Sequence, residues 1–418
     1  MNDTIINQTV SAGAFSVTIA EAADQLENIC RTYFEKDKAG GYIIPVNRQR
    51  PVMLMGPAGI GKTDIPKQVA EKMDIGYVSY SITHHTRQSA LGLPKITTHT
   101  YNGNDVLTTE YTASEIIASV RDEIESSGKS NGILFIDEVN CISETLSAPM
   151  LQLFQNKTLG QSQLPDGWIL VAAGNPPEYN KSVKEFDAVT KDRIRIINVI
   201  PDSKAWLAYA DKRMLNPAVK AYISVDESKL YYFDQENTAI VTPRGWEELS
   251  ITLDSYEKNG FEVTACLIHQ FIGAENIARE FYDYYNMVTK TISSEEIESI
   301  VNGTAPAAVS KKLAKSTMNV RFMLIECLKR YIAGAAETDF ESSCKMLGNA
   351  TDFVEKTFGS HSEMEILMSK MLSDARVVRA AIASKNDRFA KYLNDIATAE
   401  RTIRAKLKTM PANKREGA

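Results

Sequence analysis

The first 200 residues alternate between short apolar runs and longer stretches in which apolar residues recur at helical spacing. The apolar runs are at 51–55, 77–82, 132–136, 169–173 and 194–200, and the helical spacing is at 18–36, 64–73, 114–125 and 143–156. Short apolar runs are typical of buried strands, and strands that alternate with helices indicate a parallel sheet. The pattern therefore predicts an α/β domain whose sheet carries helices on both faces.

After about residue 201 the strand pattern ends and helical patterns dominate. Helices are predicted at 203–214, 245–258, 263–288, 294–301 and 307–334, with several more to about residue 408. We expect an α/β core over residues 1–200, a helical domain over 201–300 and a further helical region over 301–418 that ends in a frayed tail. Residues 1–17 are polar and weakly patterned, so they are predicted to be a loose lead-in.

A glycine-rich segment with the spacing G-x-x-x-x-G-K-T follows the first apolar run. It consists of Gly56, Pro57, Ala58, Gly59, Ile60, Gly61, Lys62 and Thr63, and Asp64 begins the helix after it. Glycines let backbone N–H groups approach phosphate oxygens, and the N-terminus of the helix favours the same anion. Lys62 can reach the outer phosphates, and the Thr63 hydroxyl can bind Mg²⁺. The segment therefore predicts a nucleoside-triphosphate site.

Polar residues end two later apolar runs. Asp137 and Glu138 follow the run at 132–136, and Asn175 follows the run at 169–173. The carboxyl ends of parallel strands form the ligand crevice of such sheets, where an Asp can hold Mg²⁺ and a Glu can orient the attacking water. Asn175 could share the positioning of water, although Asn-Pro is also ordinary turn chemistry.

Composition limits the classes of function. The net charge of −6 gives no global basic excess for bulk nucleic-acid binding, although a local basic groove stays open. The five cysteines are far apart, which favours reduced thiols and a cytoplasmic protein. We expect neither a secretory signal nor a membrane-spanning helix, because no apolar run approaches the required length.

The ordered motifs resemble those of AAA+ ATPases and, more narrowly, of the MoxR-like group. Gly56–Thr63 is similar to a Walker A loop, Ile133–Glu138 to a Walker B strand, and Asn175 to sensor 1. Asp192-Arg193 is placed like an arginine-finger segment, and Thr242-Pro-Arg244 like sensor 2. The segment 157–168 resembles the insertion that precedes sensor 1 in that group. The resemblance covers about residues 45–250 and is thin beyond about 300.

The resemblance implies a role for each matching residue. Lys62 would bind the β and γ phosphates of ATP, with the loop residues and Asp64 around them, and Thr63 and Asp137 would hold Mg²⁺. Glu138 would polarise the water, assisted by Asn175. Arg193 would reach the nucleotide of a neighbouring subunit, with Arg195 as a rival for that role or a surface ion pair with Asp187 or Asp192 as the alternative. Arg244 would contact the phosphates from the helical domain, which would act as a lid; the alternative is that Arg244 only caps or pairs within the helical part.

The resemblance also implies a homo-hexamer or similar ring that couples ATP hydrolysis to remodelling of a protein partner. In this family the partner is often a protein with a von Willebrand A-type domain. One alternative is a switch or scaffold that hydrolyses slowly, and a second is a motor on nucleic acid. Glu138, Asn175 and Arg193 favour catalysis over a switch, and the acidic charge counts against nucleic acid. ATP rather than GTP is not decided by any motif.

The segment from His84 to Asn104 is predicted to be a loop or hairpin, because glycines, Pro94 and alternating threonines replace the core patterns. Ring ATPases of this kind carry an insertion at this point that can face the central pore. Adjacent histidines on an extended segment point to opposite faces, so His84 and His85 are interpreted as polar loop residues rather than as metal ligands.

Overall fold

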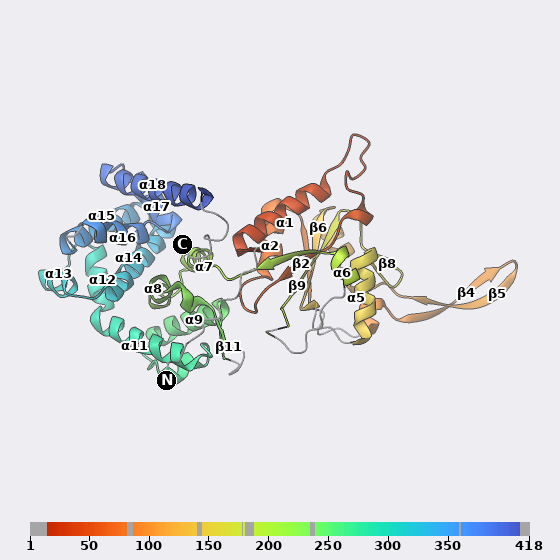
Figure 1. Cartoon of the computed structure of the whole chain (residues 1–418), viewed down its shortest axis with the longest axis horizontal. Coiled ribbons are helices and arrows are strands. Elements are labelled where there is room, and N and C mark those ends of the chain that lie inside the picture. The colour runs from red at the N-terminus through yellow and green to blue at the C-terminus, as the bar shows by residue number, and fades with distance from the viewer. Residues whose placement is uncertain are drawn as a thin grey trace. The chain divides into compact units, whose positions relative to one another are not determined.

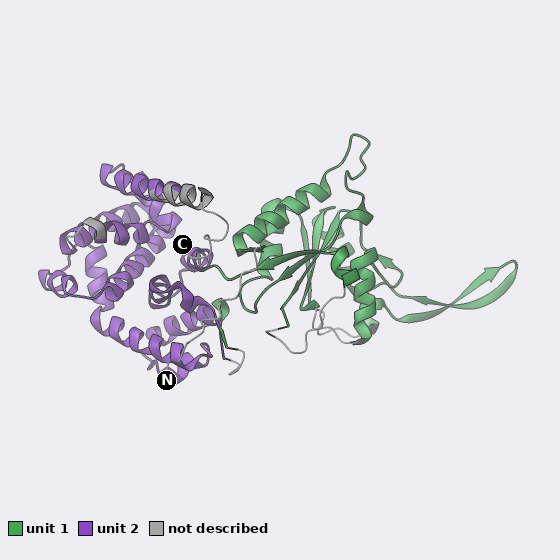
Figure 2. Cartoon of the chain, in the orientation of Figure 1, with its two compact units in different colours: residues 1–202, 233–238, 242–244 green, residues 203–232, 239–241, 245–418 purple. Residues whose placement is uncertain are grey.

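A computed structural model divides the chain into two compact units, shown in Figures 1 and 2. The residues that the structure describes are 15–81, 87–139, 144–177, 179, 188–234, 239–358 and 361–409. Unit 1 comprises residues 1–202, 233–238 and 242–244, and unit 2 comprises residues 203–232, 239–241 and 245–418. The short strands β11 (Tyr232–Asp234) and β12 (Ala239–Val241) lie where the chain passes between the units.

Unit 1 is built on a parallel sheet of six strands with the order β1-β10-β2-β9-β6-β3. The strands are β1 (Ser16–Val17), β2 (Val52–Met55), β3 (Gly76–Ser81), β6 (Gly132–Asp137), β9 (Trp168–Gly174) and β10 (Arg195–Val199). The parallel sheet predicted from the apolar runs is confirmed. The prediction of a loose lead-in is wrong at its end, because Ser16 and Val17 pair with β10 and extend the sheet by one strand.

Helices cover both faces of this sheet. They are α1 (Ile19–Phe34), α2 (Asp64–Met73), α3 (Arg87–Leu91), α4 (Glu115–Ser127), α5 (Glu144–Asn156) and α6 (Ala188–Arg193). Alternate residues of β6 and β9, such as Leu134 and Leu170, form one buried cluster with α4 and α5. Because successive strand residues point to opposite faces, their neighbours pack on the other side, where α1 and α2 lie.

A single tryptophan fixes the spacing at the amino ends of three strands. Trp168, Gly132 and Gly76 are in register across β9, β6 and β3, and Trp168 is almost fully buried. A Cβ on Gly132 would lie 2.6 Å from the indole, and one on Gly76 would lie 2.9 Å from it. The two glycines therefore leave the space that the indole occupies.

A long antiparallel hairpin separates α3 from α4. Strands β4 (Pro94–Tyr101) and β5 (Asn104–Tyr111) pair along their whole length and extend away from the sheet in Figure 1. A hairpin is present, as predicted for residues 84–104, but it continues to Tyr111, and the helix α3 inside that range was not predicted. Residues 82–86, with His84 and His85, lie outside the described residues. Ile96 and Leu107 are 72% and 74% exposed and lie diagonally on one face. A second hairpin, β7 (Thr158–Leu159) and β8 (Ser162–Gln163), lies within the segment 157–168 that resembles the insertion before sensor 1.

Unit 2 is helical, as predicted from residue 203 onward. Its helices are α7 (Ser203–Lys212), α8 (Pro217–Val225), α9 (Pro243–Asn259), α10 (Ala265–His269), α11 (Glu275–Thr291), α12 (Ser294–Val301), α13 (Ala307–Ala314), α14 (Met318–Thr338), α15 (Phe340–Thr357), α16 (His361–Met371), α17 (Ala375–Ala383) and α18 (Asp387–Thr409). None of the described helices has both the length and the apolarity that a membrane crossing needs.

Two of the predicted helices are each divided in two. The prediction of one helix over 263–288 is wrong because the chain leaves the helix between α10 and α11, where Gly273 donates a backbone hydrogen bond to Ile240 O at 3.1 Å. The prediction over 307–334 is wrong because α13 ends before Lys315 and Thr317 precedes a new helix, α14. Both breaks depend on tertiary packing or on capping rather than on the apolar period.

Buried charges connect the two halves of unit 2. Lys220 Nζ lies 3.0 Å from Asp211 and 2.9 Å from Glu326, and Lys329 Nζ lies 2.9 Å from the same two carboxylates. All four side chains are at most 8% exposed, so each charge is compensated where water cannot do so. The buried apolar residues of unit 2 also form one cluster. The division into domains over 201–300 and 301–418 stays a prediction.

We expect Gly132→Ala to lower the stability of the protein by about 1–3 kcal/mol, because the added Cβ would overlap the rigid indole of Trp168. Gly348→Ala is the matched control. Gly348 lies inside α15 with open space around its Cβ position, so alanine there should raise stability by up to about 1 kcal/mol. Thermal unfolding midpoints of the two variants measure the difference, and an unchanged midpoint for Gly132→Ala would contradict this packing.

Candidate nucleotide site

The phosphate-loop segment Gly56–Thr63 connects the carboxyl end of β2 to α2. Glycine is required at Gly56, where a Cβ would lie 2.3 Å from the carbonyl oxygen of Val199, and at Gly59 and Gly61, whose φ angles are +72° and +98°. Because α2 begins at Asp64, its first N–H groups face this loop without intrahelical partners. The backbone thus forms a compact turn that leads to the positive end of a helix.

Lys62 is held inside this turn. Its ammonium donates hydrogen bonds to the carbonyl oxygens of Gly56, at 2.8 Å, and Pro57, and to Asn175 Oδ1 at 2.9 Å. The side chain is 8% exposed, and burial lowers the pKa of Lys62 to about 8, an effect that Asp137 opposes and Arg244 reinforces. The loop therefore places a buried ammonium where phosphate oxygens would compensate its charge.

Thr63 and Asp137 meet across the loop although they lie 74 positions apart. The Thr63 hydroxyl donates to Asp137 Oδ2 at 2.9 Å, and the backbone N–H of Glu138 donates to Asp137 Oδ1 at 2.8 Å. Glu138 has a left-handed backbone with φ of +54°, a conformation that is uncommon for residues other than glycine. Its side chain is exposed, and Glu138 directly follows the last residue of β6.

Asn175 follows the last residue of β9, at the same carboxyl ends of the strands. Its hydrogen bond with the Lys62 ammonium brings sensor-like and loop residues into direct contact, which the sequence pattern did not predict. The water-positioning role of Asn175 stays a prediction.

The segment Thr242–Arg244 lies against the phosphate loop and belongs to unit 1. The backbone N–H of Arg244 donates to Gly59 O at 3.2 Å, and a Cβ on Gly59 would lie 2.8 Å from Thr242 Cβ. Arg244 is close enough for its positive charge to lower the pKa of Lys62. The sequence pattern marked the segment Thr242-Pro-Arg244, but it did not predict the contact of Thr242 with Gly59.

Arg193 lies away from these residues. It precedes β10, which begins at Arg195 in register with Val52, so it lies at the amino end of the sheet. The strand β10 spans about 13 Å between that end and the edge of the phosphate loop. Asp192 pairs with Arg50 at 3.9 Å rather than with Arg193, and Asp187 lies outside the described residues. The rival Arg195 stacks over the ring of Tyr33 at 5.9 Å.

The residues present fit a magnesium-bound nucleoside triphosphate. Hydroxyl and carboxylate oxygens are ligands that Mg²⁺ prefers, and those of Thr63 and Asp137 are already adjacent. A glycine-rich turn, a helix N-terminus and Lys62 supply donors for phosphate oxygens. Among the described residues, no group of three or more His, Cys, Asp or Glu side chains suggests a different metal site.

Comparison with known families agrees with this geometry. Residues 51–194 match the AAA domain family of the dynein-related subfamily. Unit 1 has the AAA+ fold. The matched segment runs from the residue before β2 to the residue after Arg193, so it includes the phosphate loop, Asp137, Glu138 and Asn175.

Matches to individual proteins carry less information. No curated protein matches the chain. Among solved structures, the chain is similar to a closed-state cryo-EM reconstruction of Hsp104 with ATPγS and FITC casein, at 18% identity and a TM-score of 0.39. That match covers 59% of this chain and 46% of the Hsp104 chain, so the chain spans less than half of that protein.

We expect Lys62→Ala to weaken ATP binding at least about tenfold, because charge-assisted hydrogen bonds to phosphate are lost. Lys67→Ala is the matched control, since Lys67 is an exposed lysine on α2 and its loss should leave the dissociation constant unchanged. Calorimetric titration with ATP measures both constants. Equal constants for wild type and Lys62→Ala would place the nucleotide elsewhere.

Proposed function

We propose that the chain is a Mg²⁺-dependent ATPase of the MoxR-like group. One observation carries the proposal: residues that follow three separate strands lie together at the carboxyl ends of those strands. They are Lys62, the Thr63–Asp137 pair, Glu138 and Asn175. A structural turn would not need a buried ammonium held among the carbonyl oxygens of a glycine-rich loop. The family match of residues 51–194 supports the same class of activity.

Hydrolysis would require little movement of these residues. Lys62 would exchange its carbonyl partners for β- and γ-phosphate oxygens, which return its pKa toward the normal value. Thr63 Oγ1 and Asp137 would hold Mg²⁺, which neutralises charge on the phosphates when it is bound. The Glu138 carboxylate would accept a hydrogen bond from the water that attacks the γ-phosphorus, and the bond from that phosphorus to the bridging oxygen would break to give ADP and phosphate.

Arginines would complete the site from two directions. Arg244 would reach phosphates of the same chain, and its backbone hydrogen bond to Gly59 O on the loop supports this role. Arg193 lies at the amino ends of the strands, and the length of β10, about 13 Å, separates it from the phosphate loop. That distance is too great for Arg193 to reach a nucleotide on the phosphate loop of its own chain. If Arg193 stabilises the transition state, it would therefore do so for the nucleotide of a second copy.

A shared site of this kind requires assembly, and we propose a ring such as a homo-hexamer that acts on a protein partner in the cytoplasm. The resemblance to the MoxR-like group supports remodelling of the partner, with a von Willebrand A-domain protein as the favoured class. The β4–β5 hairpin is a candidate contact for that partner, because Ile96 and Leu107 are exposed on one face. A two-stranded ribbon is only marginally stable alone, so a covering partner would stabilise it.

The variant Glu138→Gln tests the chemistry. It should bind ATP normally and reduce turnover by at least about a hundredfold, because the amide cannot take the proton of the water. Glu71→Gln removes a carboxylate from the exposed side of α2 and should leave turnover unchanged. Steady-state phosphate release measures both. Near-normal turnover in Glu138→Gln would remove Glu138 from the catalytic role.

The dependence of ATP turnover on protein concentration tests the shared site. Turnover per chain should rise with concentration and then reach a plateau, because Arg193 acts only after assembly. Mass photometry at the same concentrations shows whether the rise follows assembly. Full turnover in samples that contain only monomers would contradict a site completed by a second copy, and no turnover in fully assembled protein would favour the switch.

A further inference from the structure

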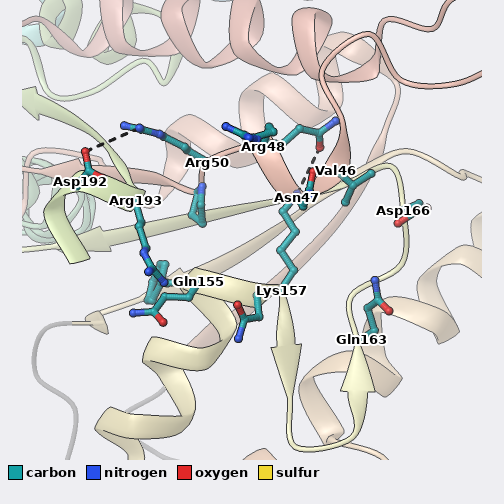
Figure 3. Close-up of a pocket in the computed structure, with 14 residues that line it drawn as sticks. Val46, Asn47, Arg48, Arg50, Gln155, Lys157, Gln163, Asp166, Asp192 and Arg193 are labelled. Atoms are coloured by element: carbon teal, nitrogen blue, oxygen red, sulfur yellow. Dashed lines mark hydrogen bonds and ion pairs between the residues drawn. The ribbon is translucent and has the colours of Figure 1, made fainter. Parts of the chain in front are cut away.

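Unit 1 contains a cavity of about 760 Å³ that the proposed ATPase mechanism does not use, apart from Arg193 on its wall. It is formed by the segment 46–51, the end of α5 with the turn after it, and the residues before β10 (Figure 3). Four cationic side chains line it, against two carboxylates. The cations are Arg48, Arg50, Lys157 and Arg193, and the carboxylates are Asp166 and Asp192.

Lys157 lines this cavity and is held in an unfavourable backbone conformation. It follows the last residue of α5 with φ of +56°, a position at which helices ordinarily end in Gly or Asn. Its N–H donates to Leu153 O and its carbonyl oxygen accepts from Leu164 N, both at 2.9 Å, so the backbone is fixed. The residue is 7% exposed. The fixed backbone holds this lysine side chain inside the protein at a cost in backbone strain.

The only hydrogen-bond partner of the Lys157 ammonium among the described residues is neutral. Lys157 Nζ donates to Gln49 Oε1 at 3.3 Å, and Gln49 Nε2 donates to Tyr33 O and Ile44 O at 2.8 and 3.0 Å. The buried Gln49 is thereby oriented with its oxygen toward the lysine. Burial lowers the pKa of Lys157 to about 8, and the exposed Asp166 opposes this only from a distance. The ammonium is therefore incompletely compensated.

The guanidinium groups near the mouth are available to a ligand. Arg48 and Arg193 are exposed, and neither forms an ion pair with a carboxylate in the described part of the chain. Arg50 lies 3.9 Å from Asp192 with both side chains mainly exposed, so that pair is weak. In Figure 3, Lys157 extends toward the segment that carries Arg48 and Arg50. Guanidinium forks match the oxygens of phosphate.

We propose that this cavity binds a phosphate-bearing anion, with the Lys157 ammonium as the buried anchor and Arg48 and Arg193 at the mouth. The volume is in the range of small-ligand sites. Because the cavity lies at the amino ends of the strands, the nucleotide on its own phosphate loop cannot supply the anion. The phosphate comes either from a free ligand or from a nucleotide held by a second copy.

Titration of Lys62→Ala protein with sodium pyrophosphate tests the site, since that variant removes the lysine of the phosphate loop. We expect saturable binding that becomes at least about tenfold weaker in Lys62→Ala/Lys157→Met. Arg48→Gln, at an exposed position that folding does not require, should weaken it several-fold in the same background. Lys38→Met, another exposed lysine of unit 1, should leave it unchanged.

A second arm distinguishes the two sources of phosphate. Lys62→Ala protein is mixed with Glu138→Gln protein loaded with ATP, and their association is measured with and without Lys157→Met in the first partner. Weakened association without pyrophosphate binding assigns the anion to the second copy, and pyrophosphate binding assigns it to a free ligand.

Failure of both arms, or equal binding with and without Lys157→Met and Arg48→Gln, overturns the proposal. The pyrophosphate titration measures binding and does not depend on ATP turnover, so a negative result there would not count against the proposed ATPase activity.

Discussion

Parallel pairing of β2, β9 and β6 is the constraint on which the candidate site depends. Met55 is opposite Gly174, and Ile136 is opposite Ala172, so the three strands end within a residue or two of one another. The residues that follow them are consequently neighbours: the phosphate loop, Asp137 and Asn175. The hydrogen bonds of Lys62 with Asn175 and of Thr63 with Asp137 then join positions that are far apart along the chain.

The same pairing places a second set of charges at the amino ends of the strands. β2 and β10 begin opposite each other, and β9 begins three residues earlier, so the residues before these strands all lie at the amino ends of the sheet. Trp168 fills the space over Gly132 and Gly76 there, and Arg193, Arg48 and Lys157 surround the neighbouring cavity. The carboxyl ends of the strands thus have the features of a nucleotide site. The amino ends carry cationic side chains, and a nucleotide bound to the phosphate loop of the same chain cannot supply the anion that would pair with them.

Local patterns predicted most of the parts of this site but few of its contacts. The phosphate loop, the acidic pair after β6 and Asn175 are each marked by the residues beside them, because strand ends and glycine turns are encoded locally. The Lys62–Asn175 hydrogen bond and the contact of Thr242 with Gly59 join distant segments and have no local signature. The same reason explains the missed strand β1, the broken helices of unit 2 and the burial of Lys157.

The central claim is that a nucleotide site on one copy is completed by Arg193 of another, and a complementation assay tests it most directly. Glu138→Gln and Arg193→Ala proteins are each expected to hydrolyse ATP poorly. In a mixture, the Arg193→Ala protein supplies a nucleotide site with an intact Glu138, and the Glu138→Gln protein supplies an intact Arg193 to that site. The account predicts turnover in the mixture well above that of either variant alone. A mixture no more active than the average of the two variants would contradict it.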